Sequence, residues 1–295
     1  MRITFKTSID RALIDFSRVQ ERLAELQRQI ATGKKVAKPS DDPAAMNRAL
    51  AIRTDLTTNG QYLRDIDSGM ARLGTTEAAL GSTTEILQRV RELAVLGANG
   101  TLDQSQLNEV ASEVNQLLEE MISVGNTKFA SQYVFGGHQT TATPFTGVGV
   151  PPTSVTYNGD GGVIERDISE GIRVQVNVAG DTALNSTFSA LITLRDDLQA
   201  GNIAAISGAD LGNLDTALDD VLTVRGQLGA TSNRLELTRN RLDGAGLSAR
   251  EQLSGLEDAD FVDTLVRLNA QEAALEAALG TVARSIQSTL LNFLR

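Results

Sequence analysis

The sequence contains no cysteine and no tryptophan, and it has a single histidine, His138. Without cysteine the chain can form neither disulfides nor thiolate metal sites. With one imidazole it offers little for general acid–base or metal chemistry, and no acidic residue lies at ligand spacing from His138. We therefore expect no enzymatic activity, no cofactor and no metal site, which leaves a structural or binding role.

Long apolar runs are also missing, because no stretch reaches about 18 apolar residues, and we expect no insertion into a membrane. Residues 1–8 lack the apolar segment of a cleaved signal peptide, so export, if it occurs, should use a route that reads no such peptide. Positive charge is scarce as well. The net charge of -10 argues against nucleic acid as a partner.

Both ends of the chain carry a narrow apolar stripe with the spacing of a helix. In the first segment the stripe precedes Gly33, which should end the helix. Such stripes are typical of coiled-coil seams and predict two long terminal helices. The stripe residues are Ile9, Leu13, Phe16, Val19, Leu23, Leu26 and Ile30 at the start, and Phe261, Leu265, Leu268, Leu275, Leu279, Val282, Ile286, Leu290 and Phe293 at the end.

Three further helices are expected between the terminal ones. Ser40, Asp41, Asp42 and Pro43 form a helix start, with oxygen-bearing caps ahead of a proline in the first turn, and this helix should run to about residue 96. Apolar residues at helical spacing predict a second helix over residues 107–121 and a third over residues 211–242. The chain is thus expected to be mainly α.

The interval from about residue 133 to residue 180 is different in character. Ile172, Val174, Val176 and Val178 alternate with polar residues at a period of two, which predicts a strand. The run from Asn158 to Gly162 supplies residues that tolerate positive φ, and it predicts a hairpin between residues 155–157 and 163–164. We expect a small β unit inserted between helices.

The terminal stripes need partners, since a helix with so narrow a stripe is not stable alone in water. The two ends have matching periodicity and opposite charge. Residues 2–38 carry 9 basic and 4 acidic side chains, whereas residues 257–276 carry one arginine and six acids. We therefore expect the two ends to pair, with charge setting the register more than the stability.

Three segments resemble the flagellin superfamily. These are Thr32-Gly33-Lys34-Lys35 with the following run from Lys38 to Ala45, the run from Arg225 to Ala230 with Asn233-Arg234-Leu235, and the run from Asp258 to Phe261. The resemblance covers roughly residues 1–135 and 185–295. The runs from Asn126 to Lys128, Gln132 to Gly137, Thr143 to Phe145 and Val155 to Asp160 resemble the hook-associated junction branch of that superfamily.

This resemblance implies a fold of long coiled-coil-like helices from both termini in a rod-like bundle, with a small β insert. It implies a terminal core domain (1–40 and 258–295), a helical rod domain (41–135 and 185–257) and an outer β-rich unit (136–184). It also implies a structural protein of the bacterial flagellum that joins hook to filament and templates filament growth. The implied partners are further copies in a ring, the adjacent junction protein, flagellin, and an export chaperone at the C-terminal helix.

On this interpretation the terminal stripe residues form subunit interfaces, and Ser40, Asp41, Asp42 and Pro43 form a cap and turn. The implied location is extracellular, in the flagellum, after type III flagellar export. Two alternatives stay open on the sequence: a short flagellin that builds the filament itself, and an adhesive or ligand-binding module in which the helices merely display the β unit.

Overall fold

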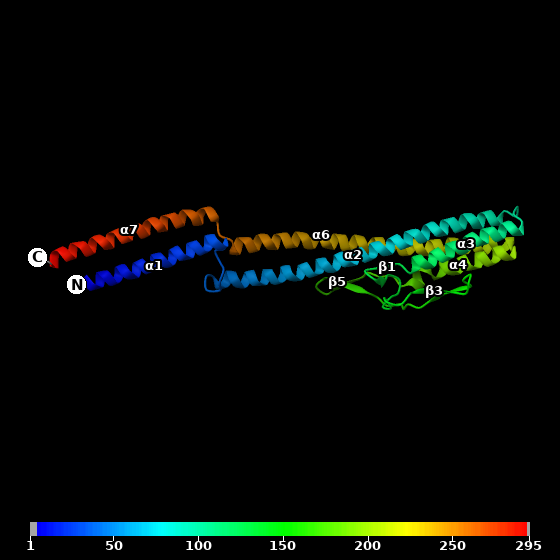
Figure 1. The fold of residues 1–295 in the computed structure, drawn as a ribbon, viewed down its shortest axis with the longest axis horizontal. Helices are drawn as coiled ribbons and strands as arrows, with labels where there is room; N and C mark the ends of the chain where they lie inside the picture. Colours follow the sequence, from blue (N-terminus) through cyan, green and yellow to red (C-terminus); the bar gives the residue numbers. More distant parts are fainter. Residues whose placement is uncertain (1–4, 294–295) are drawn as a thin grey trace. The chain divides into compact units, whose positions relative to one another are not determined.

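The computed structural model describes residues 5–293, and it describes the side chains of residues 10–281. The chain is mainly α, as predicted (Figure 1). The helices are α1 (Phe5–Thr32), α2 (Pro43–Ala98), α3 (Gln104–Gly125), α4 (Gly180–Ala200), α5 (Ile203–Ala205), the π-helical turn η1 (Ile206–Asp210), α6 (Leu211–Glu257) and α7 (Phe261–Phe293). Among residues 5–293, no helix combines the length and the apolar character needed to cross a membrane.

The chain divides into two compact units. Unit 1 comprises residues 1–58 and 245–295, and unit 2 comprises residues 59–244. Helices α2 and α6 contribute residues to both units, whereas α1 and α7 belong to unit 1 and α3 and α4 belong to unit 2. The hydrophobic core lies within unit 2, where buried residues from Ile66 to Leu235 form one continuous cluster.

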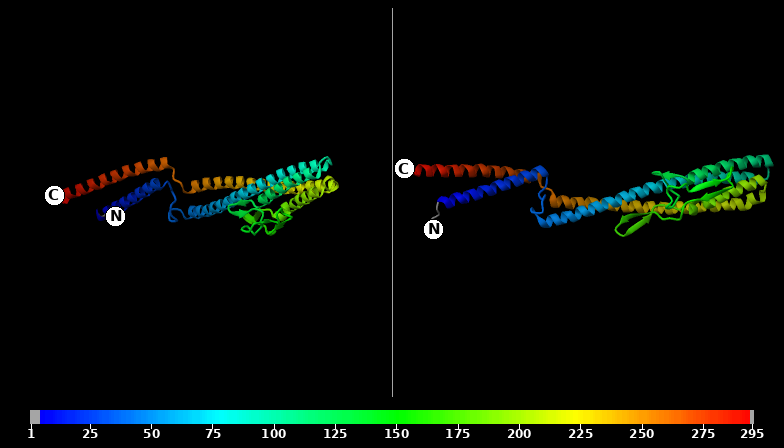
Figure 2. Two further views of the ribbon diagram at one scale, coloured as in Figure 1. Left: turned by 45° about the vertical axis from the view of Figure 1, so that its right-hand side comes forward. Right: turned by 60° about the horizontal axis from the view of Figure 1, so that its bottom comes forward.

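Unit 2 is a bundle of α3, α4 and the unit 2 portions of α2 and α6. The α3 and α4 helices lie side by side in all views (Figure 2). Ion pairs join α2 to its neighbours: Arg91 Nε lies 2.7 Å from Asp215 Oδ1 of α6, and Arg89 Nη2 lies 2.7 Å from Glu113 Oε1 of α3. Because these pairs are exposed, each contributes at most about 1 kcal/mol, and apolar burial supplies most of the stability.

Helix α4 is the element that sequence analysis did not identify. It begins at Gly180 and buries Leu184, Phe188, Leu191 and Leu198 on one face. The helix is rich in threonine, which has a low helix propensity, and it follows directly on a region with β character. Packing against α3 stabilises it, so tertiary contacts override local preference here.

Six short strands make up the β region between α3 and α4. They are β1 (Lys128–Phe129), β2 (Gln132–Tyr133), β3 (Phe145–Val148), β4 (Ser154–Tyr157), β5 (Glu165–Ser169) and β6 (Ile172–Gln175). They form three separate antiparallel pairs, β1 with β2, β3 with β4 and β5 with β6. The predicted β character of this interval is confirmed, and β6 coincides with the alternating valines.

The predicted hairpin across residues 158–162 is wrong. Strand β4 pairs with β3, and the segment after it does not return along β4. Instead, Asp160 Oδ1 accepts hydrogen bonds from the backbone N–H groups of His138, at 2.6 Å, and Gly162, at 3.0 Å. The Asn177 side chain binds the backbone of Ile164 and Gly162. Side chains therefore satisfy the backbone groups that a hairpin would have paired.

Phe145 attaches the β region to the helices of unit 2. Its ring is 1% exposed and lies 5.1 Å from the ring of Tyr157 and 4.9 Å from that of Phe188 in α4, measured between centroids. A Cβ at Gly125 or at Gly180 would lie only 2.7 Å from this ring. Glycine is required at both positions because Phe145 occupies the space that a side chain would need.

Candidate assembly surface of the terminal helices

Helices α1 and α7 of unit 1 pack against each other, which confirms the prediction that the two ends pair (Figures 1 and 2, blue and red). On α1 the predicted stripe residues Phe16, Val19, Leu23, Leu26 and Ile30 are half-buried, and on α7 the same holds for Leu268 and Leu275. The α7 side chain of Gln271 donates to the Val19 carbonyl of α1 at 3.4 Å. The pair therefore covers only part of each stripe.

The rest of the described stripe is open to solvent. Leu13 is 58% exposed on α1, and Phe261, Leu265 and Leu279 are exposed on α7. Val262 and Val266 add to the apolar surface at the start of α7, where these side chains are 40% to 70% exposed. The side chains of Ile9, Val282, Ile286, Leu290 and Phe293 lie outside the described residues.

Helices α1 and α7 have no apolar core of their own. Between residues 10 and 281, every buried hydrophobic side chain of unit 1 lies outside these two helices, at Val36, Met46 and Ala49. Unit 2, by contrast, buries its apolar side chains in one continuous cluster. Two paired helices that bury so little depend on further contacts for stability.

The predicted role of charge in pairing α1 with α7 is wrong for the described side chains. Ion pairs within each helix occur, such as Arg18 with Asp15 and Arg267 with Asp263, but none joins α1 to α7 between residues 10 and 281. The basic and acidic groups of the two segments meet only in the connectors between helices, where Lys34 binds Glu257.

The two connectors, residues 33–36 after α1 and residues 257–259 before α7, are joined by backbone hydrogen bonds. Lys35 N donates to the Glu257 carbonyl at 2.7 Å, and Ala259 N donates to the Gly33 carbonyl at 2.9 Å. Gly33 has a φ of +69°, the left-handed conformation that ends α1 at Thr32 and that other residues adopt only at a cost. We call this pair of segments the connector clasp.

Glu257 is the charged centre of the clasp. Its side chain is buried, and its Oε2 accepts hydrogen bonds from Lys34 Nζ and from Arg53 Nη2 of α2, both at 2.7 Å. Burial tends to raise the pKa of this carboxyl, but the hydrogen bonds from Lys34 and Arg53 together lower it below its ordinary value. A buried carboxylate with two cations fixes the end of α6 to the start of α2.

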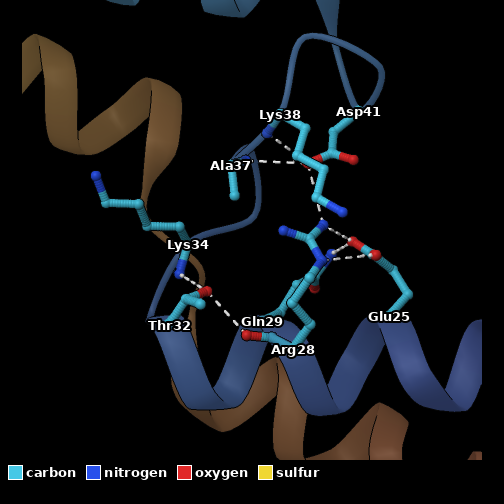
Figure 3. Close-up of polar contacts among 8 residues, drawn as sticks. All are labelled: Glu25, Arg28, Gln29, Thr32, Lys34, Ala37, Lys38 and Asp41. Carbon is cyan, nitrogen blue, oxygen red and sulfur yellow. Dashed lines mark hydrogen bonds and ion pairs between the residues drawn. The ribbon is translucent and has the colours of Figure 1, made fainter.

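A second polar cluster holds the loop between α1 and α2 (Figure 3). Arg28 of α1 binds Glu25 on its own helix, and its Nη2 also lies 3.0 Å from Asp41 Oδ2. The same Asp41 oxygen accepts from the backbone N–H groups of Ala37, at 3.0 Å, and Lys38, at 2.9 Å. These N–H groups, followed by Arg28, lower the pKa of the Asp41 carboxyl.

The structure assigns different positions to the residues expected to cap α2. Asp42 Oδ1 accepts from Ala44 N and Ala45 N, both at 2.9 Å, which is the geometry of a helix cap ahead of Pro43. Asp41 does not cap α2, because its carboxylate binds the preceding turn and Arg28. Ser40 is exposed between them.

Sequence analysis missed the residues of the clasp. Glu257 and Lys34 are 223 positions apart, so no local pattern links them. The only available signal was the resemblance of the segments around both residues to one family. His138 lies in an exposed loop, with Nε2 3.0 Å from the Val163 carbonyl. Within the described residues, no group of three or more histidine, aspartate and glutamate side chains could hold a metal ion.

Long paired terminal helices, with an exposed apolar stripe and a β region inserted between bundle helices, define a class of self-assembling filament proteins. The model of the bacterial flagellin N-terminal helical region matches residues 11–140, and that of the C-terminal helical region matches residues 211–294. Together these matches cover more than half of the chain, so it belongs to the flagellin family.

Within that family the chain is similar to flagellar hook-associated protein 3. It is 26% identical to the protein of that name from Escherichia coli (strain K12) over 277 residues, which cover 85% of this chain and 86% of the relative. It is 24% identical to the one from Salmonella typhimurium over 309 residues, covering 95% and 96%. The flagellar junction protein FlgL from Legionella pneumophila has the same fold, with a TM-score of 0.61 at 16% identity, over 72% of this chain and all of that one.

Proposed function

We propose that this protein is a structural subunit of the bacterial flagellum that joins hook to filament and templates assembly of flagellin. The observation that carries the proposal is the exposed apolar surface of α1 and α7, two helices without a core of their own. The similarity to hook-associated protein 3 along most of the chain supports the same role. No step in this role requires catalysis.

In this role the terminal stripes complete their burial only in the assembled structure. Ordering a chain segment costs about 1 to 2 kcal/mol per residue, so incorporation needs a surface that covers the stripes. Copies of this chain in a ring, the adjacent junction protein and flagellin would provide such surfaces. Residues 1–40 and 258–295 would form the inner core, residues 41–135 and 185–257 a surrounding rod, and residues 136–184 an outer unit.

Before assembly the exposed stripe of α7 would need protection, and an export chaperone that binds this helix would supply it. The protein would reach the outer end of the flagellum through the flagellar type III export apparatus, without a cleaved signal peptide. Amide hydrogen exchange on the free protein tests the stripes directly. We expect residues 10–32 and 261–281 to exchange faster than the buried segments of unit 2, and strong protection in a verified monomer would contradict the proposal.

A substitution on the α7 stripe tests the function in cells. Leu268→Asp places a charge on the half-buried stripe, and we expect cells with this variant to carry hooks without filaments and to release flagellin into the medium. Asn269→Asp adds the same charge at the exposed neighbouring position and is the matched control, with normal filaments expected. Normal filaments with Leu268→Asp would refute the interface assignment.

The short-flagellin alternative differs in copy number. A junction protein is present as about one ring per flagellum, whereas a filament subunit is present in thousands of copies, so quantification in purified flagella separates them. Deletion of residues 144–179 tests the adhesive alternative. An adhesin would lose its binding activity with this segment, whereas an assembly subunit should still support filaments if the bundle folds.

A further inference from the structure

The outward side of α6 in unit 2 carries an exposed stripe that none of the contacts described above explains. Leu222 is 45% exposed and Leu237 is 72% exposed, although the opposite side of the same helix is buried in the bundle. At 100° per residue the exposed positions fall on one side of the helix. We call this side the α6 outer face and define it by Asp219, Leu222, Gly226, Ala230, Asn233, Arg234, Leu237 and Arg241, all of which are exposed.

The charges on this face are separated along the helix. Asp219 lies three residues before Leu222, and Arg234 lies three residues before Leu237. Neither Asp219 nor Arg234 forms an ion pair within residues 10–281 of the chain. The face thus has an acidic site beside one exposed leucine and a basic site, at the same spacing, beside the other.

The middle of the face is nearly free of side chains. A Cβ at Gly226 would meet no atom within 4 Å, so the surface there is open. Further along, Ala230, Asn233, Arg234, Leu237, Thr238 and Arg241 line a shallow hollow around the second leucine. A side chain from another helix could enter this hollow without moving the backbone of α6.

We propose that the α6 outer face is a register contact between neighbouring copies of this chain, in which Leu222 of one copy meets Leu237 of the next. This inference rests on the proposed function, because subunits of an axial structure with different partners at its two ends must share one orientation. In parallel helices, a displacement of 15 residues, about 22 Å, places Asp219 against Arg234 as well as Leu222 against Leu237. Both leucines and both charges are then matched by one displacement.

The occupant is a second copy and not an unrelated partner, because the two ends of the face are complementary to each other in charge and in apolar character. The contact is small. Stable interfaces bury roughly 800 Å² on each partner, far more than two leucines and one ion pair provide. The α6 outer face would therefore set the stagger of copies already held together by the terminal helices, and it would not form dimers in solution.

The absence of native cysteine allows a direct test by disulfide cross-linking in isolated flagella. Two full-length double variants, Leu222→Cys with Leu237→Cys and Asp219→Cys with Arg234→Cys, should give a ladder of linked copies on oxidation. A disulfide requires Cβ atoms about 4 Å apart, so the displacement must match closely. Asp219→Cys with Arg241→Cys is the control. It would link antiparallel helices, and we expect no ladder.

A ladder with the control pair alone would overturn the parallel register. Normal filaments without a ladder from either test pair would overturn the contact and leave the proposed function standing. If cysteine variants do not support filaments, charge reversal gives the second measurement. Asp219→Arg and Arg234→Asp should each reduce motility, and the double variant should restore it. The two positions are about 22 Å apart within one copy, so failure to restore motility would refute a contact between copies.

Discussion

The buried carboxyl of Asp210 gives a prediction whose magnitude follows from the structure. Asp210 ends the π-helical turn before α6, is 1% exposed, and has no hydrogen-bond partner for either carboxylate oxygen within the described residues. Burial, followed by the neighbouring carboxylate Asp197 of α4, raises its pKa from 3.8 to about 6. Asp197 itself accepts from Asn202 Nδ2 at 3.0 Å.

The sign of the effect follows from proton binding. Between pH 3.8 and 6 the folded protein holds a proton on Asp210 that the unfolded chain has lost, so stability falls as the pH rises through this range. The loss relative to the protonated form is about 1 kcal/mol at pH 4.5 and at most about 3 kcal/mol at pH 7.5. Below pH 3.8 both states bind the proton and the effect disappears.

Asp210→Asn removes the charge and retains the shape. We expect the variant to be more stable than the parent protein at pH 7.5, and the gain to exceed that at pH 4.5 by up to about 2 kcal/mol. Any cost of the amide that is independent of pH cancels in this difference. Urea unfolding at the two pH values, followed by circular dichroism at 222 nm, measures it.

Asp243→Asn, at an exposed position of the same helix, is the matched control and should show no such difference. An equal change in stability at both pH values for Asp210→Asn would refute the reasoning. It would mean that the carboxylate of Asp210 is solvated or paired in the folded protein, so that its charge costs nothing.

Three further predictions concern local structure. Glu257→Gln removes the charge that binds two cations in the clasp, and we expect a loss of about 1 to 3 kcal/mol in unit 1 with faster tryptic cleavage at Lys38; an unchanged rate would contradict this. Ala130→Asn with Ser131→Gly replaces two residues with φ of 47° and 68° in the β1–β2 turn, and the melting temperature should rise with about 1 kcal/mol of added stability. Asp42→Ala removes the cap of α2 and should cost about 1 kcal/mol in urea unfolding, whereas Asp42→Asn should restore most of it.

Much of the helical fold could be predicted because its signals are local. Asp42 and Pro43 mark the start of α2 in sequence, and the structure begins the helix at Pro43. The apolar stripes of α1 and α7 indicated that the two ends pair. Their partners beyond the single chain are not encoded in local spacing, which is why the interface residues remain a proposal.

The clasp and the β region depended on contacts that no local pattern reveals. Glu257 meets Lys34 across 223 positions. The segment from Asn158 to Gly162 has the composition of a hairpin turn, but Asp160 binds the His138 backbone instead, because β4 is already paired with β3. In both places the competing partner comes from a distant part of the sequence.

The attachment of the β region through Phe145 has a practical consequence. The turn between β5 and β6 contains Gly171, with a φ of +68° and open space around it. This turn takes no part in the attachment to the helices, so its length is free to change while the bundle stays as it is. A short foreign peptide inserted there would be displayed at the surface of every copy, which makes the protein a candidate carrier for antigens or affinity tags.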